Sequence, residues 1–465
     1  MWAVEKDPAL RSDFLNITIL ERKPDERRVR AKLEGMLEEI PRLTERVVSP
    51  PLRIAPPAWR PDPDFDLDYH LRKVAVPAPG GMRELLDLSA AIAAAPLDRS
   101  RPLWEFTLVE GLEGGRAALL QKVHHTVTDG VGGIKLSLSL LDFEPDPPDA
   151  DATRSPAQRI AAETKATERR SATADPVDRT TPVDVLNDAL AFAVRGQLSR
   201  ARGAIEGALG LLTHPDRAGR GVGEALALAR SIRRQVLVTE PARSPLMSGR
   251  SPQRRFETFR APLDDARAVA DRLGGTVNDV FVTGVTGALG LYHERMGTPC
   301  EELRMAMPVN TRRGDKPAGT NQFAPTRVVV PVQPKDPIAR FQLVHERLGA
   351  LRDEPAIAAA GSLAGLLAPV PTALLVALTR SQARTIDFAT SNLRGSPVEL
   401  YAGGARIEAN YPMGPRTGCA LNVTLLSYKG SMDMGLNVDP AAVSDSEALL
   451  DCLGDSFDDL LAAVP

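Results

Sequence analysis

A polar, proline-rich segment divides this 465-residue chain into two parts, each of which alternates between strand-like and helix-like patterns. A chain of this length exceeds the size at which one hydrophobic core stops growing, so more than one domain is expected. Prolines and charges crowd PDPPDADATRSPAQRIAAETKATERRSATADPVDRTTP, which follows Glu144 and indicates a linker or a mobile insertion. We predict an N-terminal half over residues 1–145, a partly helical, Arg-rich linker over 146–250 and a C-terminal half over 251–465.

The first half has the alternating pattern of an α/β fold. LNITIL, residues 15–20, predicts a strand, and RRVRAKLEGMLEEIPRL has the apolar spacing of a helix that ends at Pro41. The next passage, PPLRIAPPAWRPDPDFDLDYH, is so rich in proline that we expect it to be irregular. Three more elements follow, a helix, a strand and a helix: MRELLDLSAAIAAA, RAALLQKV and GVGGIKLSLSLL.

The second half repeats the same rhythm. LDDARAVADRLGG and TVNDVFVTGVTGALGLYHERMG predict helices, and LRMAMPV and TRVVVPV predict strands. LNVTLLSYKGSMDMGLNVD predicts two strands that turn at Lys429-Gly430. A capping box from Ser444 to Glu447 predicts the start of a last helix, and its apolar positions predict a buried face. The fold class is therefore α/β.

Composition excludes several classes of protein. The net charge of −3 and the pI near 6.2 argue against a nucleic-acid binder, which would carry a basic excess. The three cysteines are scattered and odd in number, so they suggest neither a disulfide framework nor a zinc site. The N-terminus lacks the apolar core of a signal peptide, and we expect a cytoplasmic protein.

Two segments could contact a membrane. Residues 356–379 are uncharged and long enough to span a bilayer, but Pro369 and Pro371 interrupt them, which favours two shorter buried helices. Residues 191–234 carry eight arginines against three acids, an excess of five positive charges. Such a helical segment suits an anionic membrane surface or a solvated helix face, and both interpretations stay open.

The stretch QKVHHTVTDG places His124 and His125 side by side at the end of an expected strand. Loops at strand ends often present catalytic groups, and a histidine there can accept a proton from a hydroxyl near pH 7. Asp129 could approach the same ring, or it could turn away and hold the loop through a charged partner. Gly130 allows a sharp exit of the backbone.

Other interpretations of the pair were weighed. A metal site would need more ligands, and the remaining histidines, His70, His214, His293 and His345, do not have that spacing. The G-x-S-x-G elbow of serine hydrolases is absent from the sequence. A purely structural pair remains the alternative to an active site, which the pattern favours.

HHTVTDG resembles the HHxxxDG motif of the bacterial wax ester synthase/acyl-CoA:diacylglycerol acyltransferases. Its HxxxD core is shared with the wider chloramphenicol-acetyltransferase-like superfamily. Further segments resemble family motifs in the expected order and cover nearly the whole chain outside the linker: DFDLDYHLRKVAVPAPGG, LDRSRPLWEFTLVEGLEGGRAAL, TVNDV, MPVNTRR, GTNQF, SNLRGSP, YPMGP and LNVTLLSYKG. Two positions depart from the family's usual pattern, Ser396 before Pro397 and Thr320 before Asn321.

The resemblance implies two chloramphenicol-acetyltransferase-like domains with an active-site channel at their interface. It implies that His125 is the general base that deprotonates an alcohol, which then attacks an acyl-CoA thioester without an acyl-enzyme. His124 would support it. Asp129 would be structural and pair with Arg312.

It also places Asn278 near the reaction centre, where it would aid the oxyanion; a helix N-cap is the alternative for this residue. Pro102, Leu103 and Trp104 form the family's PLW motif, which we interpret as structural or channel-lining.

The implied reaction transfers a long-chain acyl group from acyl-CoA, as co-substrate, to diacylglycerol or a fatty alcohol. No bound cofactor, metal or nucleic acid is expected. Both substrates are amphiphiles, so peripheral contact with a membrane or a lipid droplet is expected. Two rivals remain: an acyltransferase for another alcohol, and a non-catalytic lipid-binding or droplet-associated protein on the same fold.

Overall fold

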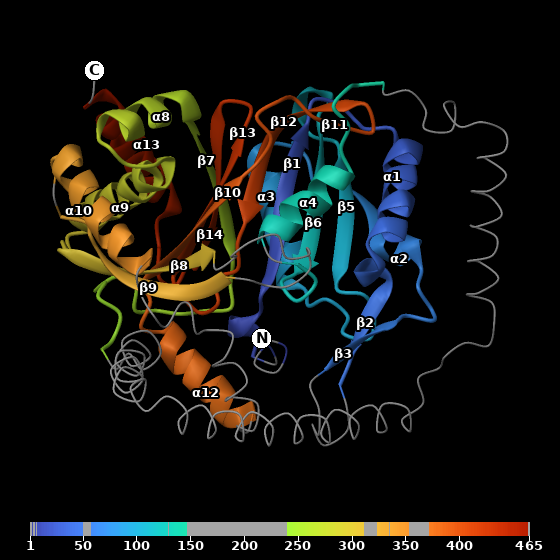
Figure 1. Ribbon diagram of the computed structural model, residues 1–465, viewed down its shortest axis with the longest axis horizontal. Coiled ribbons are helices and arrows are strands. Elements are labelled where there is room, and N and C mark those ends of the chain that lie inside the picture. The colour runs from blue at the N-terminus through green and yellow to red at the C-terminus, as the bar shows by residue number, and fades with distance from the viewer. Residues whose placement is uncertain are drawn as a thin grey trace, which may run out of the picture.

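Two six-stranded sheets form the centre of the molecule, and helices cover them (Figure 1). The computed structural model describes residues 7–49, 57–128, 130–146, 240–310, 323–333, 335–352 and 372–463, together with Trp2 and Glu5. The predicted linker lies almost entirely outside the described residues, as does the first part of the apolar run at 356–379.

The first sheet has the strand order β11-β12-β1-β6-β5-β4, and only its edge pair, β4 with β5, is parallel. Its strands are β1 (Asp13–Leu20), β4 (Leu71–Ala75), β5 (Trp104–Glu110), β6 (Ala117–His124), β11 (Tyr401–Ala402) and β12 (Ala405–Met413).

Helices cover both faces of this sheet, and the two-residue period of β6 shows how. Leu120 packs in a core with α3 (Met82–Ala94), whereas Leu119 and Val123 pack in a second core with α1 (Glu26–Glu39) and α4 (Gly130–Ser139). Because successive side chains of a strand point to opposite faces, neighbouring residues of β6 enter different environments.

The second sheet has the order β7-β14-β13-β10-β8-β9. Its strands are β7 (Arg255–Pro262), β8 (Glu302–Asn310), β9 (Phe323–Pro331), β10 (Phe388–Arg394), β13 (Leu421–Tyr428) and β14 (Ser431–Val438). The helices of this half are α8 (Leu263–Arg272), α9 (Val277–Arg295), α10 (Pro337–Arg352), α12 (Thr372–Ala383) and α13 (Ser446–Ala462). Helix α9 is buried along most of its length and contacts α8, α10 and α13.

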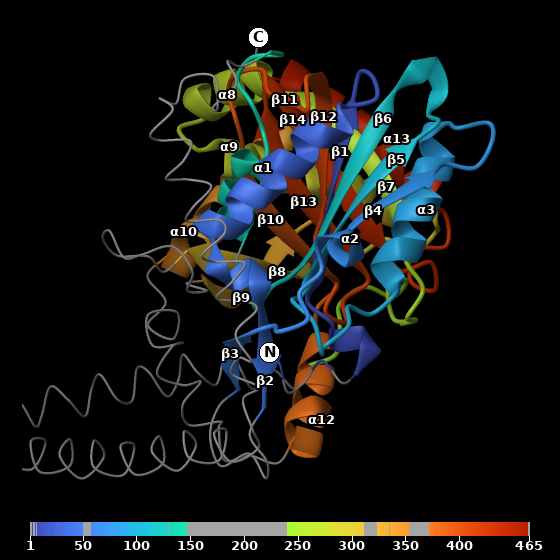
Figure 2. The same ribbon diagram turned by 90° about the vertical axis from the view of Figure 1, so that its right-hand side faces the viewer.

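The predicted C-terminal half contributes two strands to the first sheet, because β11 and β12 complete that sheet. Strand β12 lies against β13 and β14 of the second sheet (Figures 1 and 2). Gly435 permits this approach, since a Cβ there would lie only 2.3 Å from the Pro412 carbonyl oxygen. The backbone amide of Asn410 also donates to Asp433 across the junction, at 2.8 Å.

Most predicted elements are confirmed. The strands at LNITIL, RAALLQKV, LRMAMPV and TRVVVPV are present, and so are the helices around them. The turn at Lys429-Gly430 is also confirmed: both residues have positive φ, 44° and 77°, as a two-residue hairpin of this kind requires.

Three predictions about local structure were wrong. The proline-rich passage is not irregular throughout, because β3 (Ala58–Pro61) pairs with β2 (Glu45–Val48) and α2 (Leu67–His70) follows. The last helix is capped by Asp445, whose side chain accepts from the Ala448 amide, one residue later than the predicted Ser444.

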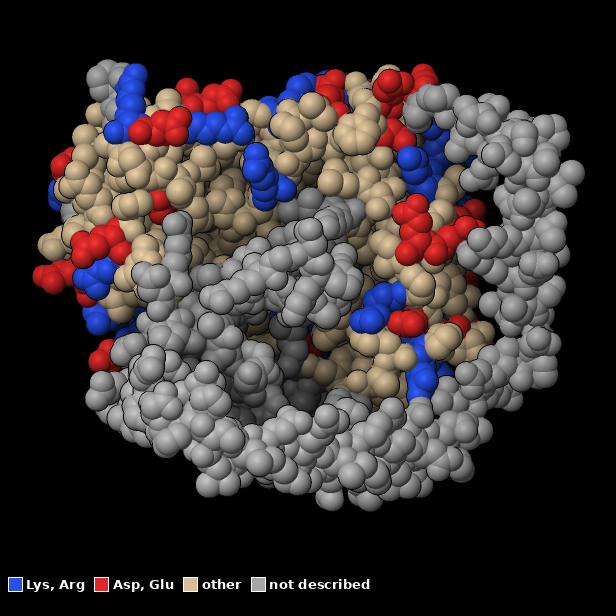
Figure 3. Space-filling view, in the orientation of Figure 1, with Lys and Arg blue, Asp and Glu red and all other residues tan. Residues whose placement is uncertain are grey.

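The third error concerns burial. Helix α12, which contains the end of the apolar run, was expected to be buried, but only Ala383 is buried and Leu374 is 59% exposed. No helix among the described residues is long and apolar enough to cross a bilayer. On the face drawn in Figure 3, described acidic and basic side chains lie interspersed.

Candidate active site

His125 lies immediately after the last residue of β6, at the start of the turn that leads to α4. Its backbone amide donates to the Ser12 carbonyl at 3.2 Å, which ties the turn to the beginning of β1. The half-buried imidazole lies against Phe14, with ring centroids 5.0 Å apart. Phe14 pairs with Val123 in the sheet, so His125 belongs to the face that α4 covers.

His124 points to the opposite face and is only 5% exposed. Its Nδ1 accepts from the backbone amide of Thr126 at 3.1 Å, so its Nε2 carries the proton and donates to the buried carboxylate of Glu5. Burial raises the pKa of Glu5, but its hydrogen bonds, the largest of them with His124, outweigh burial, and the pKa lies below its ordinary value. His124 therefore closes the turn that carries His125 and is itself held by Glu5.

Charged groups continue along the His124 face. The Asp13 carboxylate lies 3.9 Å from His124 Nε2, and burial raises the pKa of Asp13. Lys122 donates to the carbonyls of Ile92 and Ala95 at the end of α3, at 2.8 and 2.6 Å. Burial lowers the pKa of Lys122, whose bonds satisfy carbonyls that the end of a helix leaves open.

The other face of β6 carries neutral polar groups under α4. Gln121 accepts from Ser137 of α4 at 3.0 Å, and Asn16 lies opposite Gln121 on β1. Helix α4 comes close to β1 because it has a glycine there: a Cβ on Gly133 would lie 3.1 Å from the Phe14 ring. The helix that follows the histidine motif thus packs against the aromatic ring that contacts His125.

Asn278 is the second residue of α9, and the N-cap alternative for it is wrong. Thr276 is the N-cap, and Asp279 completes a capping box by accepting from the Thr276 amide at 2.8 Å. Asn278 Oδ1 accepts from Asn392 of β10 at 3.3 Å, while the partner of its Nδ2 among the described residues is the Met307 sulfur, 3.9 Å away. The TVNDV and SNLRGSP segments therefore meet, and β10 also contacts α4.

Two sequence-predicted residues cannot be placed, because Asp129 and Arg312 lie outside the described residues. Gly130, the last residue of the motif, begins α4.

The PLW motif lies in the apolar core that the first sheet forms with α1 and α4. Trp104 is 1% exposed, and its indole donates to the Leu43 carbonyl at 2.8 Å. His70, from the DFDLDYH segment, stacks on it at 4.6 Å and donates from Nδ1 to its carbonyl at 2.7 Å. Burial lowers the pKa of His70, so the ring stays neutral. Leu103 is buried beside them, and these contacts favour the structural interpretation of the motif.

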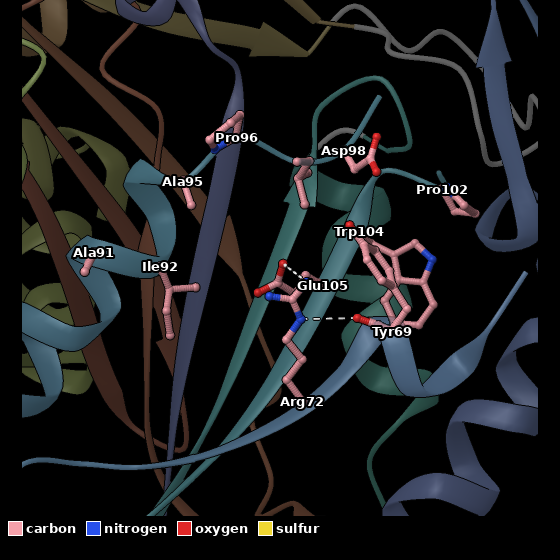
Figure 4. A pocket seen from close by; sticks show the side chains of 11 residues that line it. Tyr69, Arg72, Ala91, Ile92, Ala95, Pro96, Asp98, Pro102, Trp104 and Glu105 are labelled. Carbon is pink, nitrogen blue, oxygen red and sulfur yellow. Dashed lines mark hydrogen bonds and ion pairs between the residues drawn. The ribbon is translucent and has the colours of Figure 1, made fainter. Parts of the chain in front are cut away.

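A pocket of about 540 Å³ opens next to this motif, between α3 and the start of β4 and β5 (Figure 4). Pro102 and Trp104 line it together with Tyr69. Arg72 crosses the pocket wall, donating to the Tyr69 carbonyl at 3.2 Å and pairing with Glu105 at 3.3 Å (Figure 4). Because the pocket lies beside α3, it opens on the opposite face of the first sheet from α4.

Sequence reasoning missed Glu5, Phe14 and Asn392. Glu5 lies 119 positions before His124, and no local pattern marks it. Asn392 lies inside SNLRGSP, which was recognised as a motif but given no role. Within the described part of the chain, no group of three or more His, Cys, Asp or Glu side chains is arranged to hold a metal ion.

Comparison with known families agrees with this arrangement. Residues 13–281 match the wax ester synthase/diacylglycerol acyltransferase catalytic domain, and residues 319–461 match the WS/DGAT C-terminal domain. The chain is 38% identical to a presumed diacylglycerol O-acyltransferase of Mycobacterium tuberculosis over 464 residues, which cover 98% of this chain and 89% of the relative. A second such M. tuberculosis protein is 31% identical over 93% of this chain and 89% of its own length.

Solved structures share the fold. The wax ester synthase/diacylglycerol acyltransferase from Marinobacter aquaeolei VT8 superposes with a TM-score of 0.60 at 23% identity, covering 98% of this chain and 96% of the other. The first condensation domain of the calcium-dependent antibiotic (CDA) synthetase superposes with a TM-score of 0.59 at 15% identity, covering 100% and 93%. The chain belongs to the wax ester synthase/diacylglycerol acyltransferase family and is an acyl-CoA-dependent O-acyltransferase.

Proposed function

We propose that this enzyme transfers a long-chain acyl group from acyl-CoA to diacylglycerol, a fatty alcohol or both, with His125 as the general base. The observation that carries the proposal is the position of His125. It is half-buried at the end of β6, on a turn fixed by His124 and by the Ser12 carbonyl, beneath the helix that contacts the second sheet.

In the proposed reaction a neutral His125 accepts the hydroxyl proton of the acceptor as its oxygen bonds to the thioester carbonyl carbon. The tetrahedral intermediate then collapses, the carbon–sulfur bond breaks, and His125 returns the proton to the CoA sulfur. The products are an ester, triacylglycerol or wax ester, and free CoA. A positioned base contributes about 10²–10⁴-fold, so alignment of the two substrates and stabilisation of the oxyanion must supply the rest.

Asn278 is our candidate for the oxyanion donor. Asn392 holds its Oδ1, which directs the amide nitrogen towards a thioether, a weak acceptor that an oxyanion can replace. The positive end of the α9 dipole lies at the same place. An Asn278→Asp substitution keeps the shape but removes the donor, and we expect kcat to fall about 10²-fold, as for other oxyanion donors. A variant with the same KM and kcat as the wild type would exclude this role.

We also propose that the enzyme contacts lipid surfaces peripherally, and α12 supports this. Residues 372–379 carry no charge, and Leu374 is largely exposed. Such an exposed apolar helix can lie in the plane of a bilayer interface. Leu374→Glu should weaken binding to anionic phospholipid vesicles in a flotation assay, and Val398→Glu, at an exposed site outside α12, serves as the control. Equal flotation of both variants and the wild type would contradict the assignment.

The proposed function is tested by CoA release from palmitoyl-CoA, with hexadecanol or diolein as acceptor. We expect release that depends on the acceptor and disappears in His125→Ala. Release without an acceptor, or unchanged release in His125→Ala, would overturn the proposal; so would a folded wild-type enzyme that is inactive with both lipids.

A further inference from the structure

A cluster of amide and hydroxyl side chains lies on the His125 face of the first sheet, and the proposed chemistry does not use it. Its members come from β1, β6, β12 and α4: Asn16, Thr18, Gln121, Asn410 and Ser137. Gln121 is 3% exposed, and it is surrounded on β6 by Leu119 and Val123 of the apolar core. A polar group buried in such a place needs a hydrogen-bond partner.

Hydrogen bonds inside the cluster fix the orientation of both amides. Asn16 Nδ2 faces three oxygens, Thr18 Oγ1 at 3.0 Å, Asn410 Oδ1 at 3.3 Å and Gln121 Oε1 at 3.4 Å. Gln121 Oε1 also accepts from Ser137. The oxygen of Asn16 and the nitrogen of Gln121 must therefore point away from these contacts.

Those two outward atoms are buried and have no hydrogen-bond partner among the described residues. Asn16 Oδ1 is an acceptor and Gln121 Nε2 is a donor, and the two residues are direct neighbours across β1 and β6. Leaving each of them unpaired is unfavourable, because a buried donor or acceptor has lost its hydrogen bonds to water. A buried donor and a buried acceptor on neighbouring strands match a ligand that presents both a carbonyl and an N–H, as a secondary amide does.

The chemistry of the two substrates shows which of them can supply such an amide. A fatty alcohol presents only methylene groups beyond its hydroxyl, and a diacylglycerol ester offers a carbonyl but no N–H. The pantetheine arm of acyl-CoA carries secondary amides, the first of them two methylenes from the sulfur. Gln121 is four residues from His125 on the same side of the sheet, about 13 Å along an extended strand before either side chain reaches out.

We propose that Asn16 and Gln121 form a subsite for a pantetheine amide of acyl-CoA. The amide carbonyl accepts from Gln121 Nε2, and the amide N–H donates to Asn16 Oδ1. This inference rests on the acyl-CoA dependence of the enzyme and assigns its thioester donor to the face of β1 and β6 beneath α4.

The test compares two short palmitoyl thioesters with hexadecanol as acceptor. One is S-palmitoyl-N-acetylcysteamine, which has a secondary amide; the other is S-palmitoyl-2-acetoxyethanethiol, in which an ester oxygen replaces the N–H. We expect the wild type to use the amide donor with a kcat/KM about tenfold higher, as one hydrogen bond commonly provides. In Asn16→Leu this preference should disappear. Gln121→Leu should lower kcat/KM for both donors, with no change in the KM of hexadecanol.

Thr107→Val is the control, because it removes a buried hydroxyl of the same sheet that lies opposite Leu120, on the face towards α3 and away from the Asn16 and Gln121 amides. It should lower thermal stability and leave the donor preference intact. Binding of palmitoyl-CoA measured by calorimetry, with about tenfold weaker affinity in Gln121→Leu, gives a readout that does not require turnover. An inactive wild type that still shows this difference in affinity would overturn the proposed function and not the subsite.

Three results would overturn the subsite. The wild type could use both donors equally well. The Asn16 and Thr107 variants could change the preference alike, which would show that the preference follows stability and not the Asn16 oxygen. Gln121→Leu could impair only diolein as acceptor, which would assign the outward atoms to an ester carbonyl of the acceptor.

Discussion

The two faces of β6 differ sharply where the strand ends. The face towards α3 is ionic, with His124, Glu5, Asp13 and Lys122 buried together. The face towards α4 has amides and hydroxyls along the strand and the Phe14 ring beside His125. Because adjacent residues of a strand point to opposite sides, one pair of histidines reaches both environments.

The comparison explains why the chain has two adjacent histidines at this point. His124 uses both ring nitrogens to hold a turn and a carboxylate, so it has no free site for a substrate proton. His125 lies half-buried on the other side, beneath α4. The ionic face fixes the backbone, and the neutral face presents His125, the proposed base.

The largest effect on stability is expected from His124→Leu. This substitution leaves the buried Glu5 carboxylate with Arg99, 3.8 Å away, and removes the acceptor for the Thr126 amide. We expect the free energy of unfolding, measured in urea, to fall by about 3 kcal/mol, as when one partner of a buried pair is removed. The double variant Glu5→Leu/His124→Leu should recover part of that loss. A single variant within about 0.5 kcal/mol of the wild type would contradict the role of the ionic face.

A matched pair of glycines tests the neutral face. Gly35 of α1 has no atom within 4 Å of an added Cβ, so Gly35→Ala should stabilise the protein by about 0.5–1 kcal/mol through helix propensity. Gly133→Ala meets the Phe14 ring at 3.1 Å and must displace it. We expect no such gain there, together with a lower kcat because Phe14 contacts His125. Equal stabilisation and unchanged turnover in both variants would show that α4 does not position the base.

A smaller effect than that of His124→Leu is expected from Glu5→Gln, and it should depend on pH. Glu5 has a pKa below its ordinary value in the folded state, so its ionised form stabilises the fold above the ordinary pKa, and this contribution is lost as the pH falls through the folded pKa. The wild type should be more stable than the variant at pH 7, by about 1 kcal/mol. The difference should vanish in acid, which thermal unfolding between pH 7 and pH 3 would show. A constant difference would mean that the charge of Glu5 is not involved.

Local patterns predicted the elements well because each carries its own signal. The strand before the histidines alternates between two cores, and the hairpin at Lys429-Gly430 has the residues that its turn requires. The errors arise where two residues compete for one role. Asp445 replaces Ser444 as a helix cap one position later, and Thr276 caps α9 in place of Asn278.

Long-range contacts carried no local signal. Glu5 reaches His124 only because β1 brings the N-terminus beside β6. Strand β12 pairs with β1 although partners such as Thr18 and Asn410 lie 392 positions apart in the sequence (Figure 1). Asn392 acquires its role from its contact with Asn278 on another element. The motif predicts a base at His125, and this role stays a prediction, whereas no local pattern marks the residues that position the loop.

The division of labour between the two histidines is tested most directly by measuring turnover and unfolding free energy together, in His125→Ala and in His124→Ala. The account predicts that His125→Ala loses acceptor-dependent CoA release and keeps nearly all of its stability. It predicts that His124→Ala loses stability and keeps residual turnover with the pH profile of the wild type, since the base is still present. The reverse pattern, with turnover abolished in a stable His124→Ala and retained in His125→Ala, would contradict it.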